Sequence, residues 1–204
     1  ETHCHLDYLE PSELDTVLER SSEVGIARII TIAVSVDNLH RVMELTRQSS
    51  MIWGTQGIHP HEAERYNREV DATLRANAAD ARVLAIGEIG LDYHYDLADR
   101  AVQRRAFEQQ LQTAADLDLP VVIHTRDADE DTRDILKNVG AALTRKGVIH
   151  SFTASLSLAE FCLSEGFSLG FNGIATFNRA DNVREVVAAT PVTQLLLETD
   201  APYL

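Results

Sequence analysis

Side chains that can bind a divalent metal recur in this sequence where short apolar runs stop. They are His3 and His5 in THCH, His59 in GIHPH, Glu88 in GEIGLD, His124 in VVIHTRD, His150 in GVIHSF and Asp200 in LLLETDAP. Imidazole and carboxylate groups together suit zinc, manganese or iron, whereas a magnesium site usually has fewer histidines. Their recurrence at the expected ends of strands predicts one metal site assembled at one rim of a barrel.

The first group of residues is suited to one ion. His3 and His5 are two residues apart on an expected strand, so their side chains point to the same side. Asp200, which follows the last apolar run, can add a carboxylate to the same ion.

A second group is suited to a second ion. His124 and His150 end the fifth and sixth expected strands, and Glu88 ends the fourth, between the two groups. The two oxygens of Glu88 can bridge both ions. Two ions about 3.5–4 Å apart can activate a water and stabilise both oxygens of an in-line phosphoryl displacement. We therefore expect two divalent ions, with Mg, Mn and Zn all open as identities.

Other polar residues near these positions are weaker candidates. Asp92 and Glu198 are carboxylates close to expected ligands, and Glu198 shares a strand face with Asp200, so we expect it to orient a ligand. His61 is expected at the rim of the site. Arg126 can contact phosphate or form an ion pair with a nearby acid, and the sequence does not decide between the two.

Apolar, β-branched runs alternate with helical segments along the whole chain. The expected strands are residues 1–5, 28–33, 52–57, 83–89, 120–124, 147–150, 168–171 and 194–198. The expected helices are residues 12–24, 38–48, 70–77, 102–117, 131–143, 157–165 and 182–189. This alternation predicts a single α/β domain, residues 1–204, with the fold of a TIM-like (β/α)8 barrel. A doubly wound open sheet is the alternative. The metal-capable residues favour the barrel, because all its C-terminal strand ends meet at one mouth.

The composition limits the classes of function. The 204-residue chain has a net charge of −14 and only two lysines, whereas a protein that coats long nucleic acid is usually basic. An enzyme that holds a strand end remains compatible, since two bound divalent cations would add about four positive charges at the site. No apolar run is long enough to span a membrane. The two cysteines form no CxxC pair and fit a reducing compartment, so we expect a cytoplasmic protein without membrane contact.

Several segments resemble the TatD family of metal-dependent deoxyribonucleases, within the amidohydrolase-like barrels. The matching segments, in the family's order, are THCHLD, GIHPHE, GEIGLDYHYD, PVVIHTRDA, GVIHSF and ETDAPYL. The resemblance implies one metal held by His3, His5, Glu88 and Asp200, and a second held by Glu88, His124 and His150. It implies that His59 contacts the scissile phosphate or a further ion. The family continues beyond ETDAPYL with a further helix, so we expect the final barrel helix to be absent from this chain.

The resemblance implies an enzyme that hydrolyses DNA phosphodiester bonds, with single-stranded DNA ends as substrate and 3′ to 5′ exonuclease activity. Asp200 would also serve as general base, so the expected catalytic residues are Asp200, Glu88 and His59. The same ions could instead serve an ester, lactone or aminoacyl-ester hydrolase, which the acidic charge favours. A third reading is a metal-stabilised scaffold or inactive fragment. The oligomeric state is left open.

Overall fold

A computed structural model describes residues 1–203 and contains one seven-stranded parallel sheet. The strands are β1 (Ile29–Thr31), β2 (Ile52–Gln56), β3 (Val83–Asp92), β4 (Val121–Arg126), β5 (Gly147–Ile149), β6 (Ser168–Phe171) and β7 (Leu195–Leu197). Each strand pairs with the next one in the chain, from β1 to β7. A doubly wound sheet would reverse its strand order at a switch point, so the sequential order excludes that alternative.

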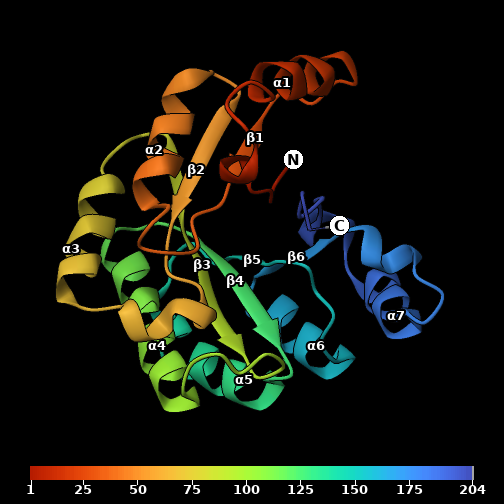
Figure 1. Ribbon diagram of the computed structural model, residues 1–204. Coiled ribbons are helices and arrows are strands. Elements are labelled where there is room, and N and C mark those ends of the chain that lie inside the picture. The colour runs from red at the N-terminus through yellow and green to blue at the C-terminus, as the bar shows by residue number, and fades with distance from the viewer. Residues whose placement is uncertain (204) are drawn as a thin grey trace.

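The connecting helices surround the sheet on its outer side (Figure 1). They are α1 (Leu14–Glu23), α2 (Leu39–Gln48), α3 (Arg68–Asn77), α4 (Arg100–Asp116), α5 (Asp129–Asn138), α6 (Leu156–Ser164) and α7 (Asp181–Ala189). Short 3-10 helices are η1 (Leu6–Tyr8), η2 (Pro60–Arg65), η3 (Gly140–Ala142), η4 (Gly173–Thr176) and η5 (Val192–Gln194). The predicted TIM-like α/β fold is confirmed. None of the helices among residues 1–203 is both long and apolar enough to cross a membrane.

Residues 1–5 join the two edges of the sheet, but not as the strand that we expected. They make a single parallel bridge, between Cys4 and Thr31 of β1. On the other side, the Thr2 hydroxyl donates to the carbonyl of Leu197, and the Asp200 amide donates to the carbonyl of His3 at 2.9 Å. The segment divides its hydrogen bonds between both edges, so no regular ladder forms on either side. Figure 1 shows the two chain ends close together at this junction.

Alternation along the strands separates an outer core from a small interior layer. The outward side chains pack under the helices in a large cluster that includes Ile123 and Ile149. The interior layer is formed by Ala85, Val122 and Val148, with Leu196 packed against them. This apolar layer lies beneath the polar residues at the C-terminal strand ends.

Candidate metal centre

Strand periodicity carries three polar side chains into the mouth of the barrel. His124, His150 and Glu198 each lie two residues beyond a member of the interior layer, on β4 and directly after β5 and β7. Since side chains two residues apart share a face, they extend the interior layer toward the mouth. His150 and Glu198 are buried, and His124 is partly buried.

Glu88 enters the mouth because β3 is irregular. The register of β3 against β4 shifts between Gly87 and Ile89, which leaves Glu88 as an extra residue without a pairing partner. Glu88 lies three residues beyond Ala85, so regular alternation would point it outward. A Cβ at Gly87 would lie 2.6 Å from the Val122 Cβ, so glycine permits the close approach of the two strands. Such bulges often redirect a side chain at a functional site.

The Glu88 carboxylate is surrounded by histidines from four segments. Its Oε1 lies 2.7 Å from His150 Nε2, 3.1 Å from His124 Nδ1 and 3.5 Å from His59 Nε2. Its Oε2 lies 3.5 Å from His3 Nε2. The two oxygens therefore face two different sets of imidazoles.

The set on the Oε2 side is completed by the chain segment that closes the sheet. Asp200 Oδ1 lies 3.5 Å from His5 Nε2 and 3.6 Å from His3 Nε2. The His3 ring stacks on the His150 ring, with 3.8 Å between centroids and 7° between planes. The two sets are therefore in contact, and all seven residues expected at the site lie in one mouth.

Hydrogen bonds determine which nitrogen of two histidines carries a proton. His59 Nδ1 accepts from the His61 amide at 3.1 Å, so the proton of a neutral His59 is on Nε2, which faces Glu88. His124 Nε2 lies 3.0 Å from Asp92 Oδ2 and donates to it. The Nδ1 lone pair of a neutral His124 is then directed into the centre.

The mutual contacts perturb the ionisation of the cluster. Burial opposes ionisation of Glu88, but His150, His59 and His124 outweigh it and hold the pKa of Glu88 well below its usual value. Burial would lower the pKa of His150, but the Glu88 and Glu198 carboxylates raise it well above its usual value. For His124, hydrogen bonds to Asp92 and Glu88 likewise outweigh burial and raise the pKa. Burial lowers the pKa of His59 well below its usual value, so His59 is neutral at pH 7.

Several buried atoms of the cluster have no hydrogen-bond partner among the described residues. They are both ring nitrogens of His3, Nδ1 of His5, Nδ1 of His150 and Oε2 of Glu198. Unpaired buried polar atoms are costly, and His3 Nε2 is directed between two carboxylates. Three sets of ligand atoms come within 4.8 Å of one another: His3, His150 and Asp200; His3, His5 and Glu88; His59, Glu88 and His124. Mixed imidazole and carboxylate donors in this arrangement fit divalent metal ions.

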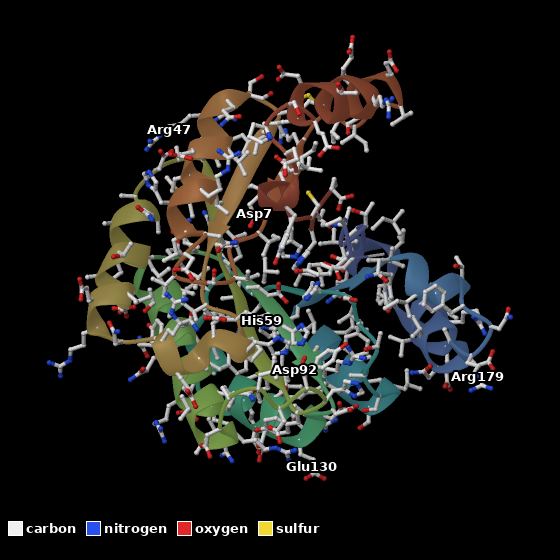
Figure 2. All side chains as sticks on the ribbon, in the orientation of Figure 1. Asp7, Arg47, His59, Asp92, Glu130 and Arg179 are labelled. Carbon is white, nitrogen blue, oxygen red and sulfur yellow. The ribbon has the colours of Figure 1, made fainter. Side chains whose placement is uncertain are left out.

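Asp92 has a larger part in the site than its sequence context indicated. It is fully buried, and its Oδ2 lies 3.0 Å from both His124 Nε2 and His61 Nε2. Its Oδ1 accepts from the amides of His94 and Tyr95. These bonds outweigh burial and lower the pKa of Asp92. A carboxylate behind a ligating histidine orients its ring and fixes its tautomer. Figure 2 shows Asp92 and His59 in the middle of the molecule.

Glu198 also lies behind a histidine: its Oε1 is 3.7 Å from His150 Nδ1, an ion-pair contact longer than a hydrogen bond. A Cβ at Gly170 would lie 2.5 Å from Glu198 Oε2, so the glycine on β6 makes room for this carboxylate. The expected place of Glu198 beside a ligand is therefore observed. At the opposite rim, the hydroxyls of Tyr8 and Tyr203 bond at 2.6 Å beside His5, a pair that the sequence pattern did not single out.

Comparisons with known proteins identify a family and several relatives that are similar to this chain. The family described as TatD related DNase matches residues 1–204. A Bacillus subtilis protein named uncharacterized metal-dependent hydrolase YabD is 37% identical over 205 residues, covering 100% of this chain and 80% of the relative. The 3′-5′ ssDNA/RNA exonuclease TatD of Erwinia amylovora is 40% identical over 192 residues, covering 93% and 74%. The crystal structure of YjjV, a TatD homologue of Escherichia coli, superposes with a TM-score of 0.91 at 34% identity, covering 99% and 78%.

Proposed function

The chain belongs to the TatD related DNase family, and from this premise we propose that it is a divalent-metal-dependent hydrolase that shortens single-stranded DNA from its 3′ end. The observation that carries the proposal is the Glu88 carboxylate, whose two oxygens face two sets of imidazoles. A shared carboxylate of this kind suits two neighbouring ions, as in enzymes that displace phosphate esters.

The proposed ligands fall into two sets that share Glu88. His3, His5 and Asp200 form the first set with Oε2 of Glu88. His124 Nδ1 and His150 Nε2 form the second set with Oε1 of Glu88. Asp92 is hydrogen-bonded to His124 from behind, and the Glu198 carboxylate lies behind His150.

Bound divalent ions would supply a water of lowered pKa and offset the charge that develops on the phosphate oxygens. The carboxylate of Asp200, whose side chain is partly open to solvent, can take the proton of the attacking water. His59 is neutral with its proton on Nε2, so it can donate a hydrogen bond to a phosphate oxygen near Glu88 Oε1. Since His59 adds no positive charge when no substrate is bound, it does not repel the cations.

The test is degradation of single-stranded DNA labelled at either end, with Mg²⁺, Mn²⁺, Zn²⁺ or chelator added. We expect 5′-labelled strands to give a ladder and 3′-labelled strands to release labelled mononucleotide at once. Glu88→Gln should abolish both reactions and reduce the bound metal, because one neutral amide cannot replace a shared anion. Glu130→Gln is the matched control, since Glu130 is exposed at the outer edge of the molecule (Figure 2).

Other outcomes would contradict the proposal. Normal rate and metal content in Glu88→Gln would exclude Glu88 as the shared ligand. Bound metal with intact DNA but with turnover of carboxylic esters would favour the ester-hydrolase alternative, with which the net charge of −14 is compatible. Bound metal with turnover of neither substrate would favour a scaffold.

A further inference from the structure

Arg126 is a cation beside the metal centre that no carboxylate of residues 1–203 neutralises. Half of the arginines of this acidic chain have a carboxylate partner among residues 1–203, as Arg65 has in Asp37 and Arg75 in Asp71. Among residues 1–203, no carboxylate oxygen lies within 4.0 Å of the Arg126 guanidinium, although Asp127 and Asp129 are close in sequence. Asp127 contacts His94, and Asp129 accepts from the Ser155 amide. The ion pair that the sequence left open is therefore not formed.

The strand places Arg126 at the mouth of the site. Arg126 ends β4, two residues beyond His124 and on the same face, and it pairs in register with Asp92 of β3. The Tyr93 amide donates to the Arg126 carbonyl at 2.9 Å, which ties the loop after β3 to the end of β4. The cation is therefore anchored beside the carboxylate that holds His124.

The guanidinium is held by an aromatic ring in a way that leaves its donors free. Its carbon lies 4.9 Å from the ring centroid of Tyr95, whose amide is bonded to Asp92. A stacked guanidinium directs its N–H groups sideways, away from the ring. Among the described residues none of these donors makes a hydrogen bond within the chain.

A hollow next to Arg126 offers space for a ligand. It has a volume of about 270 Å³ and is lined by Arg126, by the polar residues Thr153, Ser155 and Asn182, and by the carboxylates Asp127 and Asp129, which bond to other partners. This volume is near the lower end for small-molecule sites. A planar cation with free, fixed donors at the edge of a polar hollow matches a phosphate group.

We propose that Arg126, stacked on Tyr95, binds a phosphodiester group of the substrate strand next to the scissile one. The inference rests on the proposed function and adds a subsite to it. The bond is made in substrate binding and leaves the two sets of metal ligands untouched. It also gives this acidic protein a fixed positive contact with the strand that does not depend on metal.

The test combines a change in the protein with a change in the DNA. Arg126→Gln removes the cation, and a single methylphosphonate at the linkage next to the scissile one removes the phosphate charge. Each change alone should raise KM by about 10- to 100-fold, the range for a hydrogen bond between charged groups, with a much smaller effect on kcat. The two together should cost little more than either one, because both remove the same contact.

Matched variants complete the design. Arg28→Gln makes the same change in an exposed arginine just before β1, at the opposite end of the strands, and should behave as wild type. Tyr95→Phe keeps the ring beneath Arg126 and should remain near wild type, whereas Tyr95→Ala should reproduce part of the Arg126→Gln effect.

Additive penalties from Arg126→Gln and the methylphosphonate would overturn the proposal. So would a loss of bound metal in Arg126→Gln, or an equal fall in its turnover of bis(p-nitrophenyl) phosphate, which has no neighbouring phosphodiester. Either result would give Arg126 a structural role.

If the wild type cleaves no DNA, the proposed function fails. The same four combinations, measured as DNA binding by fluorescence anisotropy, still decide the subsite: coupled penalties support it, and absent binding or additive penalties reject it.

Discussion

Replacing Asp92 by asparagine changes a buried carboxylate whose four hydrogen-bond partners are all N–H donors. Oδ2 accepts from His124 and His61, both at 3.0 Å. Oδ1 accepts from the amides of His94 and Tyr95, at 3.0 and 2.8 Å. Asparagine keeps the shape but replaces one of these oxygens by an NH₂ group. In either orientation of the amide, two donors lose their acceptor.

The size of the effect follows from this count. A buried donor left without an acceptor costs about 1–3 kcal/mol, and the total should be about 2–4 kcal/mol because His61 is partly open to water. For a chain of this size, this corresponds to a fall in Tm of roughly 5–15 °C. If His124 instead reverses its tautomer to accept from the asparagine, its Nδ1 becomes protonated and can no longer bind an ion. Metal affinity at the Glu88, His124 and His150 set should fall by about 10- to 100-fold in either case.

The assay is thermal unfolding of the metal-free protein together with metal titration at pH 7.5. Asp127→Asn is the matched control, since the side chain of Asp127 is 67% exposed and, among the described residues, hydrogen-bonds only to the exposed His94. Asp127→Asn should leave both quantities near wild type. The reasoning would be refuted if Asp92→Asn bound metal as tightly as wild type. A metal affinity that fell equally in both variants would mean that general loss of negative charge, and not the donor count, is responsible.

Three further results are expected. Metal affinity should fall as the pH decreases: the pKa values of His124 and His150 are raised in the metal-free protein, so both hold protons at and above their usual titration range, and metal must displace them. For each proton that metal displaces, the apparent metal affinity should fall about tenfold per unit decrease in pH. Calorimetry in buffers of different ionisation enthalpy would count the protons released on metal binding. Release of no protons would contradict the assignment of His124 and His150 as metal ligands. Chelator should lower the Tm, because ions bound only by the folded chain stabilise it, whereas a Tm unaffected by chelator or added metal would argue against the site. Gly170→Ala should weaken metal binding, since the added Cβ would lie 2.5 Å from Glu198 Oε2. Gly173→Ala should leave metal binding unchanged, because nothing lies within 4 Å of its added Cβ. Equal effects of the two variants in a metal titration would exclude displacement of Glu198 as the cause.

Much of the fold and site followed from two periodicities in the sequence. Helical segments alternating with apolar runs predicted an α/β domain. Metal-capable residues at the ends of six of the eight expected strands then favoured the barrel over an open sheet and predicted one mouth. His124 and His150 illustrate why: each ends a continuous apolar run, and period-two alternation then places it above the interior layer. The segment 1–5 was wrongly expected as a strand, because its extended pattern does not reveal that its hydrogen bonds are divided between two edges.

The residues behind the ligands were harder to predict, because their positions depend on contacts between distant segments. The place of Glu198 near a ligand could be expected from its face of the strand, but the space that it needs is provided by Gly170 on another strand. The lack of an ion pair at Arg126 could not be inferred either, because Asp127 and Asp129, its neighbours in sequence, bond to His94 and Ser155 in the fold.

The irregularity in β3 explains why Asp92 was undervalued. Ala85 faces the interior, and Asp92 is seven residues further along, an odd separation that would point it outward on a regular strand. The register shift between Gly87 and Ile89 inserts one residue and reverses the phase of everything that follows. Leu91 then packs under the helices, while Glu88 and Asp92 both face the mouth. One bulge therefore supplies both the carboxylate shared between the two sets of histidines and the carboxylate that orients His124.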